Sequence, residues 1–265
     1  MSKDSLPQSD RPTENAAGHW VLARAGKRVL RPGGLALTRQ LLDRCSPGGR
    51  DVVELAPGLG RTAREIVAQH PRSYTGVDRD DSAVAHVTKV VQPSGGTCRQ
   101  GDANDTGLDD ASADVVIGEA MLTMQSPRAK GEIVAEAARI LRPGGSYAIH
   151  ELALAPDDID PEVGTEISKA LARSIHVNAR PLTVAQWREL LEEHGLEVEW
   201  TATAPMALLK FGRNLADEGP LGVARMVWNL LRQPALRRRV LDMRATFTQY
   251  ENQLRGVALV ARKPA

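Results

Sequence analysis

The chain contains few cysteines, few aromatic residues and almost no net charge. Its 265 residues include two cysteines, Cys45 and Cys98, and only 3% Phe, Trp and Tyr, with a formal charge of +1 at pH 7. Two distant cysteines outside any metal-ligand spacing argue against disulfides and a cysteine-based metal site, so we expect a reduced, cytoplasmic protein. The few aromatic rings offer little for nucleic-acid bases to stack on. A near-neutral chain has no global attraction for nucleic acid or membranes.

Long apolar runs are also missing. The first dozen residues are polar and include Pro7 and Pro12, so we expect a disordered tail over residues 1–15 and neither a signal peptide nor a membrane span. An apolar content of 42% and a charged content of 25% are typical of a globular protein. Residues 205–255 carry nine Lys and Arg against four Asp and Glu. This basic stretch either meets an anionic substrate or is a solvated helix face.

The most informative segment is residues 51–63, in which an apolar strand leads through a glycine turn into a helical pattern. Gly58 and Gly60 let the backbone turn tightly and approach a ligand without a Cβ in the way. Eighteen residues after Gly60, a second apolar strand ends at Asp78, whose carboxylate can accept hydrogen bonds from ribose hydroxyls. The arrangement predicts a nucleotide-shaped ligand across the first two strands of a parallel sheet.

Two classes of protein share this glycine pattern. Residues 58–63 fit the dinucleotide pattern G-x-G-x-x-G/A. They also fit the first motif of class I S-adenosylmethionine (SAM) methyltransferases, D/E-x-G-x-G-x-G. Glu54 is then the acid, and Ala56, Gly58 and Gly60 occupy the glycine positions. Ala56 departs from the motif, but alanine is a mild change that is compatible with binding.

Three later segments distinguish the two classes. Gly101-Asp102 follows a short strand, residues 112–119 form a fourth strand, and Leu-Arg-Pro-Gly-Gly at 141–145 precedes a fifth. In this order the chain resembles the class I SAM methyltransferase family, in its quinone-biosynthesis and natural-product branch, over about residues 50–204 and 254–262. The alternation of strands and helices predicts an α/β fold. The resemblance implies a Rossmann-like, seven-stranded, mostly parallel sheet with helices on both faces.

The resemblance also implies roles for site residues. Glu54 lies near the amino group of the methionine part of SAM, and Asp78 binds the ribose. Arg79 lies against the adenine, and Asp102 accepts a hydrogen bond from the adenine amino group beside the backbone N–H of Ala103. The implied cofactor-binding residues are Glu54, Ala56, Pro57, Gly58, Gly60, Asp78, Arg79, Gly101, Asp102, Ala103 and Glu119.

Fewer residues are candidates for catalysis than for cofactor binding. Glu119 follows the fourth strand, near the expected methyl group, and is a candidate substrate ligand, base or partner for the cofactor's charge. His150 and Glu151 end the fifth strand and point to opposite faces, so at most one of them faces the site. His176 is a third candidate base. Methyl transfer from a sulfonium needs a base only when the acceptor arrives protonated.

Two segments extend this core. Residues 156–181 and 205–253 are longer than ordinary connections, and such connections usually serve function. We expect both insertions, with an N-terminal helical region over residues 16–49, to form a cap over a SAM-binding domain that spans residues 50–265. Packing of the extra helices beside the sheet is the alternative.

The sequence therefore predicts a SAM-dependent methyltransferase that acts on a small molecule and releases S-adenosylhomocysteine, as a monomer or homodimer without a metal, nucleic-acid or membrane partner. Alternatives are a nucleic-acid or protein methyltransferase, a non-catalytic SAM-binding protein, and an NAD-dependent oxidoreductase. The Asn/Asp-Pro-Pro-Tyr/Phe signature of amino-group DNA methyltransferases is absent after strand four. A catalytic Tyr-x-x-x-Lys motif is also absent. The resemblance does not identify the acceptor.

Overall fold

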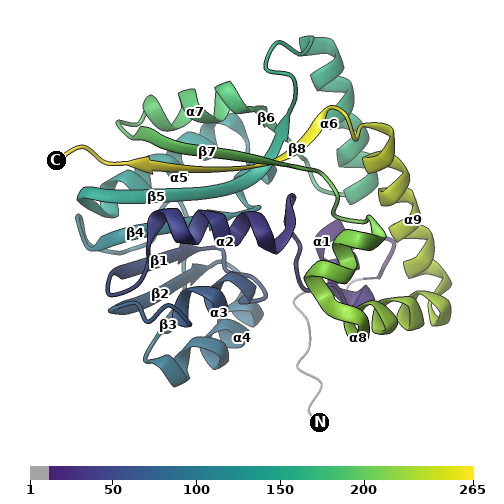
Figure 1. The fold of residues 1–265 in the computed structure, drawn as a ribbon, viewed down its shortest axis with the longest axis horizontal. Coiled ribbons are helices and arrows are strands. Elements are labelled where there is room, and N and C mark those ends of the chain that lie inside the picture. Colours follow the sequence, from purple (N-terminus) through teal and green to yellow (C-terminus); the bar gives the residue numbers. More distant parts are fainter. Residues whose placement is uncertain (1–11) are drawn as a thin grey trace.

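A computed structural model describes residues 12–265, and its centre is an eight-stranded sheet in the order β3-β2-β1-β4-β5-β8-β7, with the short β6 paired to β5 (Figure 1). Pairings from β3 through β5, and between β5 and β6, are parallel, whereas β8 runs antiparallel to β5 and β7. The strands are β1 (Asp51–Leu55), β2 (Ser73–Asp78), β3 (Thr97–Gln100), β4 (Ala113–Glu119), β5 (Leu141–Leu154), β6 (Leu182–Thr183), β7 (Glu197–Pro205) and β8 (Leu254–Arg262).

Helices cover both faces of the sheet because successive strand residues point to opposite sides. Val52 packs in a cluster with residues of α2, α3 and α4, whereas Val53 packs with residues of α5 and α7. The helices are α1 (Gly18–Ala25), α2 (Gly34–Cys45), α3 (Arg61–Val67), α4 (Asp81–Val91), α5 (Pro127–Ile140), α6 (Pro161–Ile175), α7 (Val184–Glu192), α8 (Phe211–Arg232) and α9 (Pro234–Gln249), with 3₁₀ turns η1 (Gln92–Ser94) and η2 (Leu122–Met124).

Side-chain caps fix where several helices begin. Asp80 accepts hydrogen bonds from the backbone N–H groups of Ser82 and Ala83, and so starts α4 immediately after β2. Thr183 and Gln186 form a reciprocal capping box at the start of α7. Such caps satisfy N–H groups that have no partner inside the helix. The predicted α/β sheet with helices on both faces is confirmed, with β6 as an additional two-residue strand.

Four helices, α1, α6, α8 and α9, gather beyond one end of the strands, on the right in Figure 1. A third apolar cluster joins residues of α1, α6 and α9 to Leu152 and Leu154 at the end of β5. The segments predicted as insertions contain α6 in one case and α8 with α9 in the other. Among the described helices, none combines the length and the hydropathy that crossing a membrane requires.

Several boundaries differ from those expected from the sequence. Of the N-terminal region 16–49, α1 packs with α6 and α9, whereas α2 packs on the sheet against β5 and β8. Strand β5 is longer than expected, because Leu141 already pairs with Ala113 and the strand continues to Leu154. Of the expected tail at residues 1–15, positions 1–11 lie outside the described residues.

Candidate functional site

A cavity of about 730 Å³ lies between the carboxyl ends of the strands and the helices α1, α6 and α9. Its polar wall comes from the segments that follow β1, β2 and β4, and from Glu151 of β5. Its opposite wall is apolar and comes from α1, α6, α9 and the segment after β7. In open α/β sheets, ligands bind at this edge because the loops after parallel strands converge there.

The glycine turn after β1 forms one corner of the cavity. Gly58 has φ +54°, and the backbone N–H of Gly58 donates to Asp78 Oδ2 at 3.0 Å. A Cβ on Gly58 would meet only the carbonyl oxygen of Ala56 at 3.9 Å, so this side of the turn is open. A Cβ on Gly60 would instead meet Val90 and Val87 of α4 at 3.4 and 3.5 Å. Gly58 therefore leaves space for a ligand, whereas Gly60 permits close packing of α3 on α4.

Ala56 stands where the family motif has its first glycine, and it has a positive φ of 52°. This left-handed region costs an L-residue roughly 1–2 kcal/mol. Its N–H donates to the carbonyl of Val77 at 2.8 Å, which ties the turn to the end of β2. The substitution thus keeps the conformation that a glycine would adopt, at a cost in strain.

Asp78, at the end of β2, is a buried carboxylate that lines the cavity. Besides the contact with Gly58, its Oδ1 accepts the N–H of Asp80 at 3.0 Å. Burial raises the pKa of this carboxyl, although the two backbone N–H groups oppose the shift. The carboxylate therefore braces the glycine turn and faces the cavity at the same time.

Glu54 is also buried against the cavity, but its surroundings differ. The hydroxyl of Tyr74 donates to Glu54 Oε2 at 2.6 Å. Burial raises the pKa of the Glu54 carboxyl to about 8, which the hydrogen bond from Tyr74 only partly offsets. Such a carboxyl is suited to receive a cation from the ligand, because a positive charge would favour its ionised form.

Glu119, at the end of β4, belongs to a dense buried network. Its Oε1 accepts from Thr38 Oγ1 at 2.7 Å and contacts His150 Nδ1 at 2.8 Å, and its Oε2 accepts from Arg31 and Thr62. Burial opposes ionisation, but the attraction of Arg31 and the bond from His150 lower the pKa of Glu119 to about 2. Glu119 is therefore a paired carboxylate on the cavity wall.

The candidate bases on β5 are both engaged with protein groups. His150 is fully buried, and its two ring nitrogens face Glu119 Oε1 and the carbonyl of Pro32, so neither is directed at the cavity. Glu151 lies on the other face, as expected, and accepts from the backbone N–H groups of residues 121–123 and from the Thr123 hydroxyl.

His176, which follows α6, lines the cavity. Arg239 Nη1 donates to His176 Nδ1 at 3.2 Å. Because arginine can only donate, this contact engages Nδ1, and Nε2 is the ring nitrogen that remains for a ligand.

Other cofactor candidates are divided between the cavity and its surroundings. Pro57 and Arg79 line the cavity, whereas Gly101, Asp102 and Ala103 do not. Asp102 is exposed. The Gly101 N–H donates to the carbonyl of Asp78 at 3.1 Å, which places this segment beside the end of β2. The 101–103 segment is therefore adjacent to the cavity at its strand-two side.

Apolar side chains form the far end of the cavity. Leu22 of α1, Leu171 of α6, and Met243 and Phe247 of α9 share one buried cluster and line the cavity. His19 also lines it, and burial lowers the pKa of this imidazole to about 4, so that it is neutral near pH 7. This half of the cavity suits an uncharged, apolar ligand part.

Sequence reasoning did not single out Arg31, Thr38 or Thr62. Arg31 precedes a Pro-Gly-Gly segment, and its contact with Glu119 joins residues 88 positions apart. Thr62 lies within the glycine motif, so its position could have identified it as a site residue. Nothing in the sequence identifies Thr38 as a site residue, because a threonine on an apolar helix face is common.

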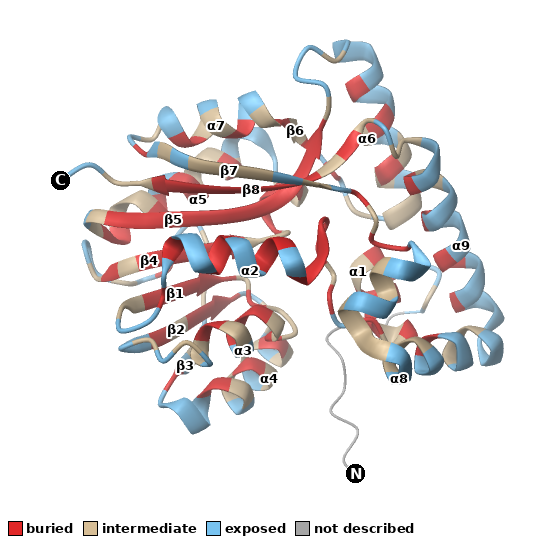
Figure 2. Ribbon diagram, viewed as in Figure 1, coloured by how far each residue is buried: buried red, intermediate tan, exposed pale blue. Residues whose placement is uncertain are grey.

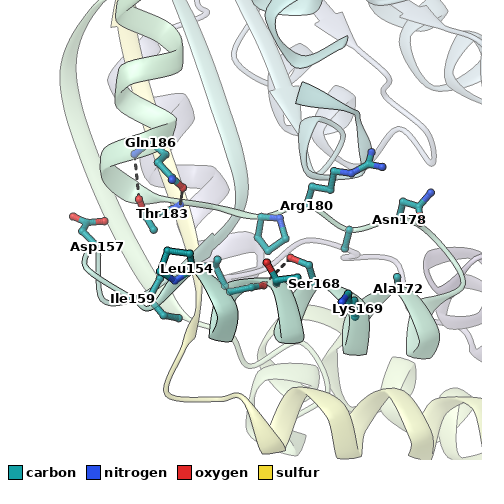
Figure 3. A pocket seen from close by; sticks show the side chains of 15 residues that line it. Leu154, Asp157, Ile159, Ser168, Lys169, Ala172, Asn178, Arg180, Thr183 and Gln186 are labelled. Carbon is teal, nitrogen blue, oxygen red and sulfur yellow. Dashed lines mark hydrogen bonds between the residues drawn. The ribbon is translucent and has the colours of Figure 1, made fainter. Parts of the chain in front are cut away.

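A second hollow, of about 450 Å³, lies between α6 and the segment 178–186 (Figure 3). Several of its polar groups bond to neighbouring protein groups: Gln186 and Thr183 bond reciprocally, and Ser168 donates to the carbonyl of Gly164. Asp157 accepts the N–H of Ala185. None of the glycine-motif residues lines this hollow.

Comparisons with known proteins identify the family of the segment that contains the glycine turn. A methyltransferase domain family matches residues 52–145. A probable S-adenosylmethionine-dependent methyltransferase from Mycolicibacterium smegmatis is 34% identical over 163 residues, which cover 62% of this chain and 57% of that protein. The chain belongs to the class I SAM-dependent methyltransferase family. Its cofactor is SAM.

Similarity extends over the whole chain in another relative. An uncharacterized protein from Haemophilus influenzae is 31% identical over 258 residues, covering 94% of this chain and 99% of that protein. The structure of Haemonchus contortus phosphoethanolamine N-methyltransferase 2 with SAM has a TM-score of 0.71 at 17% identity, covering all of this chain and 60% of that one. At such low identity, the likeness shows a methyltransferase fold.

The cavity suits SAM on physical grounds. Glu54 is a buried carboxyl with a raised pKa, which a ligand ammonium would relieve. Gly58 leaves an open surface where a side chain would otherwise stand, and Asp78 offers a buried carboxylate beside it. The described residues hold no group of three or more His, Cys, Asp or Glu arranged as a metal site.

Proposed function

We propose that the enzyme transfers the methyl group of SAM to an apolar small molecule held beneath α1, α6 and α9. The observation that carries this proposal is the division of one cavity into a charged wall at the strand ends and an apolar wall on the helices. A ligand pocket of this kind combines apolar burial with a few polar groups that fix orientation.

The substrate of one similar protein supports the same class of acceptor. A phthiotriol/phenolphthiotriol dimycocerosates methyltransferase from Mycobacterium tuberculosis is 35% identical over 107 residues, which cover 40% of this chain and 38% of that protein. By analogy, the acceptor of the present enzyme is a largely apolar compound.

The cofactor supplies a methyl group activated on a sulfonium, and the chain supplies binding and orientation. Glu54 receives the ammonium of the cofactor, and Asp78 receives the ribose hydroxyls. Gly58 and Pro57 form the turn beneath them. Arg79 and the 101–103 segment complete the adenine side, because both lie beside the end of β2.

Glu119 and His150 act as positioning groups in this proposal. Both carboxylate oxygens of Glu119 are occupied by contacts with Arg31, Thr38, Thr62 and His150. This network links β4 to the segment before α2, and so fixes the cavity wall next to the cofactor. His176 lines the cavity with Nδ1 engaged by Arg239, and its other ring nitrogen bonds to the acceptor in this proposal.

A labelled-methyl experiment tests the proposal. Purified enzyme is incubated with tritiated SAM and separated extracts of lipids, water-soluble metabolites, nucleic acid and protein. We expect label in the lipid-soluble fraction, and calorimetry to show S-adenosylhomocysteine binding far more tightly than NAD. Label confined to nucleic acid or protein would overturn the small-molecule acceptor, and binding without any transfer would favour a non-catalytic role.

Matched variants on α9 test the apolar wall. Met243→Gln places an amide in the cavity, whereas Leu241→Gln changes an exposed residue on the same helix. We expect Met243→Gln to raise the KM for the acceptor by about tenfold, since a buried amide without partners costs about 1–3 kcal/mol. Cofactor affinity should remain unchanged in both variants. Equal KM values for the two variants would place the acceptor elsewhere.

A further inference from the structure

Exposed apolar side chains are concentrated on α8. Eight large apolar residues are exposed among residues 12–265, and six of them lie on this helix. Leu221 is 84% exposed, Phe211 67% and Leu231 63%. Scattered apolar residues are normal on a surface, but a cluster on one element indicates an interaction site. Figure 2 colours the exposed residues along α8 and α9 pale blue.

The second half of α8 presents these residues as one stripe. It begins after Gly219, whose φ of 71° and ψ of 173° interrupt the helix, and after Pro220. From there, Leu221, Trp228 and Leu231 recur at helical spacing and are all exposed. The opposite side faces the protein: Met226 is buried, and Asn229 Nδ2 donates to the carbonyl of Ala25 at 3.1 Å.

Arginines flank the stripe. Arg225 and Arg232 are exposed and share its side of the helix, and the guanidinium of Arg232 lies 4.3 Å from the centre of the Trp228 ring. α9 follows after one residue and exposes Arg237, Arg238 and Arg244. We call Leu221, Arg225, Trp228, Leu231 and Arg232 the α8 face.

Carboxylates are directed away from this surface. Over α8 and α9, Asp242 is the one exposed carboxylate, against five exposed arginines. The side chains of Asp217 and Glu218 are 2% and 3% exposed and pair with Lys27 beneath the helix. The fold thus concentrates positive charge that the net charge of +1 conceals.

We propose that the α8 face docks on an anionic lipid membrane surface. Leu221, Trp228 and Leu231 enter the boundary between headgroups and acyl chains, and the arginines meet lipid phosphates. An amphipathic helix with Trp and Leu on one side and flanking cations binds membranes in this manner. Docking would hold α9, whose Met243 and Phe247 line the cavity, close to a source of apolar molecules.

A second copy of the chain is the less favourable occupant. A two-fold dimer through this face would place two arginine-rich patches against each other. Like charges placed against each other at an interface are unfavourable. An anionic surface, by contrast, complements the arginines and the apolar stripe at once.

Vesicle flotation of the full chain tests the proposal. Vesicles of phosphatidylcholine alone are compared with vesicles that also contain phosphatidylglycerol. We expect binding to the anionic vesicles only, weakened by salt. A double variant, Leu221→Ser with Trp228→Ser, and a charge reversal, Arg225→Glu with Arg232→Glu, should each reduce binding by at least about tenfold. Val163→Ser, at an exposed apolar residue of α6, is the matched control and should bind as the unaltered chain does.

Affinity for S-adenosylhomocysteine, measured on each variant, shows that the fold is intact, and it does not depend on docking. Equal binding to neutral and anionic vesicles, or variants that bind like the unaltered chain, would overturn the proposal. A dimer in sedimentation equilibrium that the Leu221→Ser and Trp228→Ser substitutions dissociate would also overturn it, in favour of a second copy. Methyl transfer to an acceptor dispersed in detergent should persist in all variants, so failure of docking remains distinguishable from failure of the proposed reaction.

Discussion

Two buried glutamates in the cavity wall have opposite acid–base behaviour. Burial disfavours the charge on both, yet the pKa of Glu54 is raised to about 8 and that of Glu119 is lowered to about 2. The difference lies in their partners. Glu54 has the neutral hydroxyl of Tyr74, whereas Glu119 has the guanidinium of Arg31 and the ring of His150. Glu54 can therefore respond to a cationic ligand, and Glu119 is already neutralised.

Cofactor binding should release a proton from Glu54. Without ligand, the raised pKa of about 8 keeps this carboxyl protonated at neutral pH, and an adjacent ammonium favours the ionised form. Affinity for S-adenosylhomocysteine should therefore rise by up to about tenfold per pH unit below pH 8 and then level off. Calorimetry in buffers of different ionisation enthalpy measures the released proton. Glu54→Gln should abolish this release, and unchanged release in that variant would assign it to another group.

Asp78 should matter both for ligand binding and for the glycine turn. Asp78→Ala removes the carboxylate that we propose accepts the ribose hydroxyls and should weaken S-adenosylhomocysteine binding by about 1–3 kcal/mol. It also leaves the N–H groups of Gly58 and Asp80 without their acceptor. Asp80→Ala is the comparison, since it removes the cap of α4 and should lower stability by about 1 kcal/mol. Dissociation constants and thermal unfolding separate the two effects. A lower Tm with an unchanged dissociation constant in Asp78→Ala would reduce Asp78 to a brace for the turn.

Residues that follow strands were predictable, whereas the buried network was not. Glu54 and Asp78 lie at strand ends and Gly58 lies in the turn after β1, and the order of strands in a parallel sheet brings such segments together. The network around Glu119 depends on Thr38 and His150, which are 112 positions apart in the chain. Local patterning carries no information on such a pairing. Candidate bases were chosen by residue type, which could not show that both nitrogens of His150 face protein oxygens.

At the scale of elements, α8 anchors the segment between α1 and α2. Glu218 Oε1 accepts the backbone N–H groups of Arg28 and Val29, each at 2.8 Å. Lys27 is buried and donates to Asn214 Oδ1 at 2.8 Å, with Glu218 Oε1 at 3.8 Å. The anchored segment continues directly to Arg31, which contacts Glu119. α8 lies outside the cavity, but it fixes one of the cavity's walls.

Loss of this anchor should destabilise the protein and weaken cofactor binding together. Glu218→Ala leaves two N–H groups without their acceptor and removes one partner of a buried ammonium, so we expect a loss of at least about 3 kcal/mol. Glu192→Ala, in a half-exposed pair with Arg188, should change stability by less than about 1 kcal/mol. Urea unfolding and cofactor titration measure both properties. Similar losses in the two variants would show that the buried anchor contributes no more than a surface ion pair.

Strands were predicted closely because they have strong local signals. A second strand ending at Asp78 and a fourth strand at 112–119 were expected, and β2 ends at Asp78 while β4 spans Ala113–Glu119. In the insertion 205–253, α8 spans Phe211–Arg232 and is interrupted at Gly219. Its first half, from Phe211, lacks a clear apolar period and is held by tertiary contacts such as those of Asp217 and Glu218.

At the scale of the molecule, the cavity has two walls, and the sequence predicts the wall at the strand ends better than the apolar wall. The strand edge follows from the parallel sheet, and its position was expected from the glycine motif. The apolar wall depends on how α1, α6 and α9 pack on one another, which is set by a separate buried cluster. The sequence could indicate that the insertions were too long for plain connections. It could not show that α9 reaches the cavity while α8 remains outside it.

Ligands that fill different halves of the cavity should protect different elements from amide exchange. In the proposed arrangement, S-adenosylhomocysteine contacts the charged wall, so we expect slower exchange in the segments after β1, β2 and β4 when it binds alone. The proposed acceptor site is the apolar wall, so α1, α6 and α9 should gain protection only when both ligands are present. The second half of α8, after Gly219, provides an internal control, because none of its residues lines the cavity. Protection of α9 by S-adenosylhomocysteine alone would show that the cofactor by itself orders the helices of the apolar wall. Protection of α8 to the same degree as α9 would show that ligand binding slows exchange throughout the helices and not only around the cavity.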